Sequence, residues 1–320
     1  MELKTVYVRV SKMLLLLIIV MMILMYCYRT AFYVKPGHHE DPYNLPQNEQ
    51  YQPYYHAMVH LVDALNNEPY EAVSIKSFDG LTLRGRLYIY DEKAPIELAF
   101  NGYRTDGIHD CGGVFQIARR LGHNMLVVDQ RATGESDGNV ISFGINERYD
   151  VVVWAEYIAH RYPQMKIVLV GGSLGAATVL MASELKLPVN VVGVVADSAY
   201  TSPKAIIKKV IQRMNLSPTI MYPFVKLSAK LFGHFNLEAS SPIQAVRKTK
   251  LPVLIIHGED DRYVPCSMAH QNYAACKSPI KMLLTIPKGP HDISLLVDWD
   301  KYQGTVVKFF KRIGVPMKNE

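Results

Sequence analysis

Hydrophobic residues are distributed along this 320-residue chain in two different patterns. The first is a continuous run without charge, residues 13–28, which continues after Arg29 with the apolar residues 31–34. A helix that spans a bilayer needs about 20 mostly apolar residues, whereas the apolar core of a cleavable signal peptide has about 7–15. The flank that follows the run is bulky and lacks the small residues of a cleavage site. We therefore predict an uncleaved transmembrane signal anchor over residues 13–34.

Charged residues on either side of the anchor indicate its orientation. Three basic residues lie in the N-terminal tail, residues 1–12, and only Arg29 and Lys35 follow the run closely. By the positive-inside rule, this favours a single-pass protein of the cell membrane with its N-terminus inside and its main domain extracytoplasmic. Residues 35–53 are rich in proline, acids and amides, and predict a linker that lifts the domain off the membrane.

The second pattern, from residue 54 onward, alternates short apolar runs with longer stretches of helical periodicity. Two early runs flank Asp79 and Gly80, a dipeptide typical of a tight hairpin turn, and predict an antiparallel edge. The later alternation is typical of a mainly parallel sheet with helices on both faces. We predict one α/β domain over residues 54–320, with residues 203–247 inserted as a small helical cap. The later runs are IELAF, NMLVVD, KIVLVG, VVGVVAD, LPVLIIHG and KMLLTIP.

Composition narrows the class of protein. The formal net charge of +6 comes from scattered lysines and arginines, which argues against a nucleic-acid partner. The four cysteines, at positions 27, 111, 266 and 276, have neither CxxC spacing nor the density of a disulfide scaffold. A zinc site and a disulfide framework are therefore not expected, and Cys111 is interpreted as structural.

The motif GGSLG interrupts an otherwise apolar stretch between a predicted strand and a predicted helix. Its residues Gly171, Ser173 and Gly175 fit the G-x-S-x-G pattern, in which a sharp turn exposes a nucleophilic serine. The helix that follows would offer free N–H groups to a developing oxyanion. A glycine-rich helix start without chemistry is the alternative. We interpret Ser173 as a nucleophile.

A serine nucleophile needs a base, and the base needs an acid that orients it. In this architecture the acid and then the histidine follow the serine along the chain. Glu259, Asp260 and Asp261 come just after one predicted strand, and Asp197 ends an earlier one as an alternative acid.

Three histidines are candidates for the base. His291 follows the last predicted strand and is our choice. His270 lies in a helical stretch, where a solvent-facing histidine is the simpler explanation. His257 precedes the acids and is expected to cap its own strand.

Taken together, six stretches give the chain a resemblance to the alpha/beta-hydrolase superfamily, over roughly residues 54–315. Within it, the chain is most similar to membrane-anchored hydrolases of the serine aminopeptidase-like subgroup. The resemblance implies Ser173 as nucleophile, Asp261 as acid and His291 as base. It also implies an oxyanion hole made of the backbone N–H groups of Tyr103 and Leu174. The stretches are FNGYRTDG, VVDQRATGESDG, VGGSLGAA, ADSAYTS, HGEDDRYVP and GPHD.

One position departs from the family pattern. The oxyanion loop usually carries His-Gly, and here it reads Asn101-Gly102, which bears on how the loop is held. In VVDQRATGESDG, Asp129 and Arg131 are expected to brace the loop after their strand.

These residues together predict a membrane-anchored serine hydrolase that cleaves an ester, or less readily an amide or peptide bond, through an acyl-enzyme. We rank carboxylesterase or lipase-like action ahead of aminopeptidase-like action, and a lipid-accepting groove beneath the cap is one option. The expected partners are a small-molecule, lipid or peptide acyl substrate and, through the anchor, the membrane. No metal and no organic cofactor is expected. An acyltransferase and a non-catalytic, membrane-tethered binding domain are the alternatives, and the oligomeric state is left open.

Overall fold

An eight-stranded sheet forms the centre of the protein, in a computed structural model that describes residues 2–35, 43, 45–46 and 48–318. The strand order is β1-β2-β4-β3-β5-β6-β7-β8. β2 runs antiparallel to β1 and β4, and the remaining neighbours are parallel. The strands are β1 Glu71–Lys76, β2 Thr82–Tyr88, β3 Ile96–Phe100, β4 Asn124–Val128, β5 Ile167–Gly172, β6 Val191–Asp197, β7 Val253–Gly258 and β8 Lys281–Ile286.

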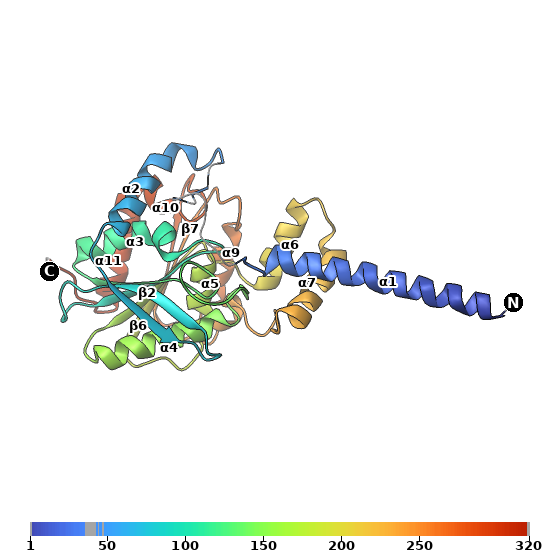
Figure 1. Cartoon of the computed structure of the whole chain (residues 1–320). Helices are drawn as coiled ribbons and strands as arrows, with labels where there is room; N and C mark the ends of the chain where they lie inside the picture. Colours follow the sequence, from blue (N-terminus) through green and yellow to red (C-terminus); the bar gives the residue numbers. More distant parts are fainter. Residues whose placement is uncertain (1, 36–42, 44, 47, 319–320) are drawn as a thin grey trace.

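Helices cover both faces of this sheet, as predicted (Figure 1). One face packs on α4, α5 and α9, with Trp154 of α4 fully buried among strand residues. The other face packs on α3 and α11, through Phe309 and Phe310 of α11 among others. The helices are α1 Glu2–Ala31, the short η1 Gln52–Tyr54, α2 Tyr55–Asn66, α3 Gly107–Leu121, α4 Glu147–Arg161, α5 Leu174–Ala182, α6 Pro203–Arg213, α7 Pro218–Phe232, α8 Pro242–Ala245, α9 Ser267–Ala275, α10 Ser294–Val297 and α11 Trp299–Arg312.

The position of each strand in the sheet explains its sequence. β3, β4 and β7 are buried along their whole length, because helices cover both of their faces, and they are mostly apolar, with Glu97, Asn124 and His257 as buried polar residues. β1 lies at the edge and alternates between exposed and less exposed positions. The predicted turn between β1 and β2 is present, with Gly80 at a φ of 89° that favours glycine.

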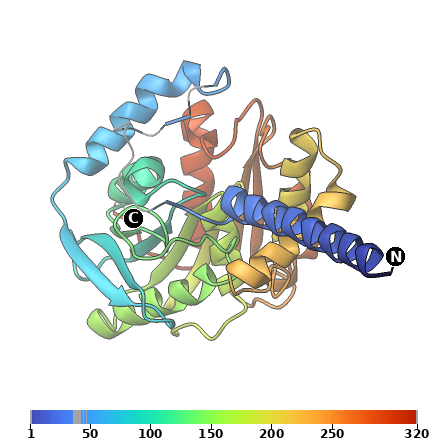
Figure 2. The ribbon, with the colours of Figure 1, turned by 45° about the vertical axis from the view of Figure 1, so that its right-hand side comes forward.

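The N-terminal helix α1 extends away from the body of the protein (Figure 1). The most apolar 18-residue stretch within Lys4–Ala31 has a mean hydropathy of 2.5, so α1 is long and apolar enough to cross a membrane. Helix α7 packs beside α1, and the rings of Tyr28 and Phe232 lie 5.6 Å apart (Figure 2).

The chain leaves α1 by packing directly onto the body. The helix ends at Ala31, and Phe32 is fully buried with its ring edge-on to Phe143 and Phe235, at 5.8 and 5.3 Å. Burial of an aromatic side chain removes a large apolar area from water, so this contact fixes the end of α1 on the domain. The anchor predicted to residue 34 therefore stops being helical before Phe32.

The segment expected to be a linker, residues 35–53, lies partly outside the described residues. Its described part packs on the body of the protein. Leu45 and Tyr51 are buried against Met58 of α2 and Ile293. Apolar side chains in this segment drive it onto the body, and the count of prolines and polar residues did not reveal this.

A helical cap follows β6, as predicted. Helices α6 and α7 pack against each other, and α7 also packs on α1 (Figure 2). Proline at the first turn of each helix suits its start, since proline lacks the N–H that would go unpaired there. α8 returns the chain to α5 and α9 before β7 begins.

Candidate active site

Ser173 lies in a strained turn between β5 and α5. Its φ of 50° and ψ of −110° are unusual for a residue with a side chain. The backbone N–H of Ser173 donates to the carbonyl of Asp197 on the neighbouring strand, at 2.8 Å, and this holds the turn. The side chain is consequently held out at the carboxyl ends of the strands, as in a nucleophile elbow.

The glycines on either side of this serine are required by close backbone contacts. A Cβ on Gly171 would lie 2.4 Å from the carbonyl carbon of Gly175. A Cβ on Gly175 would lie 2.0 Å from the carbonyl oxygen of Phe100 in β3. Real Cβ atoms do not approach backbone this closely, so any larger residue would push the turn away from β3. The glycines of the motif thus fix the position of Ser173.

Three residues from distant loops meet at this turn. His291, in the loop after β8, accepts at Nε2 from the hydroxyl of Ser173 over 2.7 Å. Its Nδ1 donates to Oδ2 of Asp261, in the loop after β7, over 2.6 Å. A carboxylate can only accept, so this pairing places the proton of the neutral imidazole on Nδ1 and leaves Nε2 free to take the serine proton. The structure thus brings together the predicted nucleophile, base and acid.

Asp261 is held from several sides. Its Oδ1 accepts from the backbone N–H groups of Tyr263 and Val264, at 2.7 and 2.8 Å. Its Oδ2 lies 3.1 Å from Nε2 of His257 as well as near His291. Burial acts to raise the pKa of Asp261, but the hydrogen bonds from the two histidines outweigh it and hold the pKa well below its usual range. The acid is therefore ionised at neutral pH.

The other candidate acids have different environments. Glu259 and Asp260 are exposed. Asp197 is buried and accepts from the hydroxyls of Ser198 and Tyr302. Burial raises its pKa. Among the residues that the structure describes, Nδ1 of the candidate base, His291, donates to Asp261 and not to Asp197.

The remaining histidines differ from one another. His270 is exposed on α9, in line with the simpler explanation. His257 is fully buried, and its Nε2 lies 2.8 Å from the carbonyl oxygen of Val264 and 3.1 Å from Oδ2 of Asp261. It therefore supports the loop of the acid, whereas we expected it to cap its own strand. Its position four residues before Asp261 was the only sequence signal of this role.

The predicted oxyanion donors lie beside Ser173. Tyr103 and Leu174 both line the cavity that contains the serine, and Leu174 is the first residue of α5. Within the described ranges of the chain, neither backbone N–H donates to another protein group. The N-terminus of α5 adds a favourable dipole. The N–H of Gly102, in contrast, is bound to the carboxyl group of Asp110.

The side chain of Asn101 holds the loop that follows β3, at the position where the alpha/beta-hydrolase pattern usually has a histidine. Its side-chain amide donates to the carbonyl of Thr105 at 2.8 Å, and its side-chain oxygen accepts from the N–H of Gln130 at 3.0 Å. Gln130 in turn donates to the backbone carbonyl of Asn101. A buried amide can donate and accept at once, so Asn101 joins the two loops that follow β3 and β4.

The loop after β4 is braced as predicted. Asp129 accepts from the N–H groups of Gly107 and Glu135, each at 2.9 Å. Arg131 is buried and donates to Asp150 and Asp79. Charge-assisted, bidentate pairs of this kind fix orientation. Neither residue lines the cavity that contains Ser173.

Two carboxyl groups with raised pKa values, those of Asp110 and Asp292, line the cavity beside the candidate triad. Burial, the largest effect, raises the pKa of Asp110 to about 6. Burial also raises the pKa of Asp292 well above its ordinary value, and its acidic neighbours add to the effect. The carboxyl group of Asp292 lies so close to Gly172 that a Cβ there would meet it at 2.4 Å.

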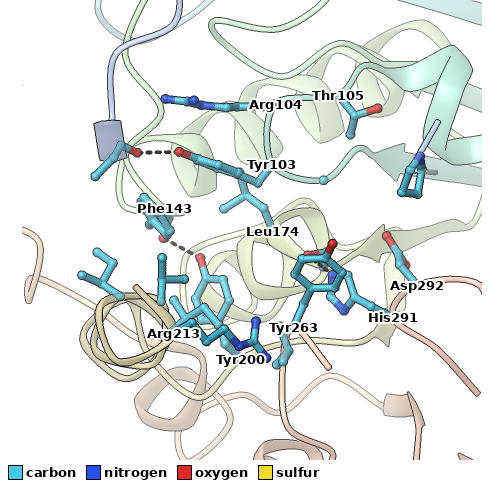
Figure 3. Close-up of a pocket in the computed structure, with 18 of the residues that line it drawn as sticks. Tyr103, Arg104, Thr105, Phe143, Leu174, Tyr200, Arg213, Tyr263, His291 and Asp292 are labelled. Carbon is cyan, nitrogen blue, oxygen red and sulfur yellow. Dashed lines mark hydrogen bonds between the residues drawn. The ribbon is translucent and has the colours of Figure 1, made fainter. Parts of the chain in front are cut away.

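The cavity in front of Ser173 measures about 560 Å³. Oxyanion-loop residues such as Tyr103 lie on one side, and Tyr200, Arg213 and Tyr263 lie on the other (Figure 3). Tyr51, from the segment expected to be a linker, also lines it and donates to the carbonyl of His291 at 3.1 Å. No pattern in the sequence indicated this contact.

The end of α1 is also part of this cavity. Tyr26, Cys27, Thr30 and Ala31 line it, although the sequence indicated only a membrane anchor there. The hydroxyl of Tyr103 donates to the carbonyl of Ala31 at 2.9 Å (Figure 3).

Arg104 strengthens the same connection. Its guanidinium donates to the carbonyls of Thr30 and Tyr33, at 2.9 and 3.0 Å. These groups satisfy carbonyls that the helix end leaves free. The oxyanion loop thus caps the C-terminus of α1.

No protein-family model matches the chain. The uncharacterized protein YqkD of Bacillus subtilis is 26% identical over 191 residues, or 59% of this chain and 62% of YqkD. Protein bem46 of Schizosaccharomyces pombe is 27% identical over 238 residues, or 72% of this chain and 74% of bem46. YNL320W of Saccharomyces cerevisiae, described as an uncharacterized membrane protein, is 24% identical over 185 residues, or 57% of this chain and 60% of that protein. The chain thus spans less than two thirds of YqkD and of YNL320W.

Solved structures show a shared fold. Pf2001, an esterase of Pyrococcus furiosus, superposes with a TM-score of 0.62 and 22% identity, over 88% of this chain and 99% of the esterase. Est1E of Butyrivibrio proteoclasticus, solved with ferulic acid, gives a TM-score of 0.57 and 19% identity, over 76% of this chain and 99% of Est1E. The fold that the sequence resemblance implied is therefore confirmed, whereas the subgroup stays a prediction.

Proposed function

We propose that this chain, which has the alpha/beta-hydrolase fold, is a membrane-anchored serine hydrolase that cleaves carboxylic esters. The observation that carries the proposal is the chain of hydrogen bonds from Ser173 through His291 to Asp261, at 2.7 and 2.6 Å. A binding domain has no need of this arrangement at the mouth of a cavity. Esterases and serine hydrolases among the solved structures with this fold support the same reaction class.

In the first half of the reaction, Oγ of Ser173 attacks the ester carbonyl carbon while Nε2 of His291 takes the serine proton. Asp261 holds the imidazole in the required tautomer and stabilises the imidazolium. The backbone N–H groups of Tyr103 and Leu174 donate to the oxyanion, a kind of stabilisation that typically contributes about 10²–10³ in rate per donor. His291 then gives its proton to the leaving alcohol, and the acyl group stays on the serine.

In the second half, water attacks the acyl-enzyme. Nε2 of His291 removes a proton from the water, and the same two N–H groups stabilise the second oxyanion. Collapse of this intermediate returns the proton to Ser173 and releases the carboxylic acid. The residues of this chain supply every group that these steps use.

We propose an acyl ester as substrate in preference to a peptide. Side chains such as Leu174, Ile207 and Met221 make much of the cavity lining apolar. An acyl chain gains from such a lining, because each buried methylene contributes roughly 0.8 kcal/mol.

We also propose that α1 holds the enzyme in the cell membrane, with the N-terminus inside and the catalytic domain extracytoplasmic. The mean hydropathy of 2.5 over the most apolar 18-residue stretch of Lys4–Ala31 supports the anchor. So does the description of a yeast relative as a membrane protein. The orientation rests on the basic residues of the N-terminal tail.

A fluorophosphonate probe and a panel of substrates test the proposal. The full-length protein should be labelled by the probe and should hydrolyse p-nitrophenyl acetate. Ser173→Ala should lose labelling and about 10³-fold or more of the turnover, because it removes the nucleophile. Hydrolysis of aminoacyl amides in the same panel would identify an aminopeptidase. Transfer of the acyl group to added alcohols, detected by product analysis, would identify an acyltransferase. Undiminished labelling of Ser173→Ala would refute the nucleophile.

A further inference from the structure

We infer that the end of the membrane anchor and the cap together form a binding site for the acyl chain of an ester drawn from the bilayer. This inference rests on the proposed ester hydrolysis and adds the source and class of the substrate. In it, α1 contributes to the substrate site as well as to anchoring. Three independent observations support it: the residues of α1 in the cavity, the surface chemistry of the cap, and the position of the cap beside α1.

The first observation is that residues of α1 form part of the cavity lining. Cys27, Thr30 and Ala31 line the same cavity as Ser173, and across from them α6 contributes Ile207 and Val210. An acyl chain attached to the serine can therefore reach the helix that lies in lipid without leaving the cavity. A cavity of about 560 Å³ is within the range of sites that enclose a small molecule or lipid chain.

The second observation is the surface of the cap. Residues 203–247 contain seven basic residues and one acidic residue, Glu238, which pairs with Lys204 and Lys226. The same helices expose large apolar side chains, and Ile220 of α7 is the most exposed of them at 64%. Basic and apolar side chains on one helical surface are typical of helices that lie in the membrane interface. The exposed apolar residues are Val210, Met214, Leu216, Ile220, Leu227 and Leu231.

The third observation is where this surface lies. Helix α7 packs along the C-terminal part of α1, the end of the helix that joins the domain (Figure 1, Figure 2). A helix that packs beside a membrane span at this end lies at the level of the lipid headgroups. The cap therefore brings one side of the cavity to the bilayer surface, from which the acyl chain enters.

The experiment uses the full-length protein in phospholipid vesicles with two substrates, p-nitrophenyl acetate and p-nitrophenyl dodecanoate. Thr30→Trp places a large side chain on the α1 wall, and Val210→Trp does the same on the α6 wall. Met25→Trp is the matched control, because Met25 is exposed on α1 and does not line the cavity. The measured quantity is the ratio of kcat/KM for the dodecanoyl ester to that for the acetyl ester.

Thr30→Trp should lower this ratio about tenfold, as expected if two methylenes of the chain lose their contact with the cavity. Val210→Trp should lower it as well, and Met25→Trp should leave it unchanged. An unchanged ratio for Thr30→Trp overturns the inference. An equal loss with both esters also overturns it, because a steric block acts on the long chain alone.

Labelling with the fluorophosphonate separates this inference from the proposed function. Wild-type protein that is labelled at Ser173 and cleaves the acetyl ester, but does not prefer the dodecanoyl ester, contradicts the inference and leaves the hydrolase proposal standing. Protein that is not labelled at all contradicts both. If Val210→Trp lowers the ratio and Thr30→Trp does not, the acyl chain lies away from the anchor, which again overturns the inference.

Discussion

At the scale of single residues, the carboxylate of Asp261 is the most constrained group of the site. Two backbone N–H groups, from Tyr263 and Val264, fix one oxygen, and two imidazoles approach the other. A group held in this way cannot rotate to follow His291, so the histidine is oriented by the acid. The backbone contacts come from the residues just ahead of Pro265, where α9 is about to begin.

Replacement of Asp261 by asparagine should therefore lower turnover on the order of 10⁴-fold, because the amide presents an N–H to Nδ1 and favours the wrong tautomer. The measurement is kcat on one activated ester, with folding checked by thermal melts. Asp260→Asn is the control, since Asp260 is exposed in the same loop, and its effect should be mild. If Asp197→Asn abolished activity while Asp261→Asn kept most of it, the acid would belong to the earlier strand.

Asp110 gives a prediction for the pH dependence of stability. Burial raises its pKa to about 6, whereas an unfolded aspartate titrates near 3.9. Between roughly pH 4 and 6 the folded protein therefore keeps a proton that the unfolded chain has lost. The stability from this group is full below pH 4 and is lost as pH rises through 6.

Asp110→Asn removes this titration, so the free energy of unfolding of the variant should fall less steeply between pH 4 and 6 than that of the wild type. Unfolding monitored by fluorescence across this range measures the difference. Asp260→Asn, at an exposed aspartate, should keep the wild-type slope. Equal slopes for all three proteins would show that Asp110 titrates normally.

The site residues that could be predicted from the sequence are those that belong to a known motif or follow a predicted strand. Ser173 lies in G-x-S-x-G, and the loops after two strands offered Asp261 and His291, because chemistry at the carboxyl ends of strands collects in one place. His257 and Tyr51 could not be predicted. Their contacts to Asp261 and His291 depend on loop conformations that no local pattern specifies.

At the scale of elements, the connection between α1 and the oxyanion loop is the main finding. Tyr103 donates its hydroxyl to the end of α1 and presents its backbone N–H at the cavity. Arg104 donates to carbonyls of the same helix end and lies 5.1 Å from the ring of Tyr103. The loop and the helix end thus stabilise each other, and a change in one alters the position of the other.

Arg104→Ala should test this connection. It removes charge-assisted hydrogen bonds to the end of α1, which should cost about 1 kcal/mol in the free energy of unfolding. It should also lower kcat for acetyl and dodecanoyl esters alike, since the oxyanion loop serves both. Arg247→Ala, at an exposed arginine at the end of the cap insertion, is the control. Unchanged stability and turnover in Arg104→Ala would mean that the loop holds its position without the helix.

The elements themselves were largely predictable, because alternating apolar runs and helical stretches specify a parallel sheet covered on both faces. The hairpin at Gly80 followed from its dipeptide. The end of α1 did not follow, since Phe32 looks like a continuation of the apolar run and is buried by tertiary packing against Phe143 and Phe235.

At the scale of the whole molecule, the proposed anchoring by α1 would determine how the protein partitions between membrane and water. We predict that the full-length protein stays in the membrane fraction after washing with high salt and alkaline carbonate, because the uncharged residues 13–28 favour the hydrocarbon. Immunoblots of pellet and supernatant measure this. A soluble, mature protein whose N-terminus lies near Ala31 would show that the segment is a cleaved signal peptide.

The sequence predicted the molecule as two separate parts, an anchor and a hydrolase domain joined by a linker. The structure describes a more integrated arrangement, in which the end of α1, the described part of residues 45–54 and the cap all line one cavity. Composition alone could not reveal this. Contacts between distant segments depend on which apolar surfaces fit each other, and a linear pattern carries little information about that fit.

The length of the uncharged part of α1 has a consequence for where the protein works best. Residues 13–28 rise roughly 24 Å as a helix, at 1.5 Å per residue, whereas the hydrocarbon of a typical bilayer is about 30 Å thick. Such a mismatch is relieved when the bilayer thins locally or when neighbouring apolar surface sinks into it. The exposed apolar residues of the cap lie at the end where that surface is needed. If α1 spans the bilayer as proposed, a thicker membrane should draw the mouth of the cavity deeper into lipid, and membrane thickness should then tune access to Ser173.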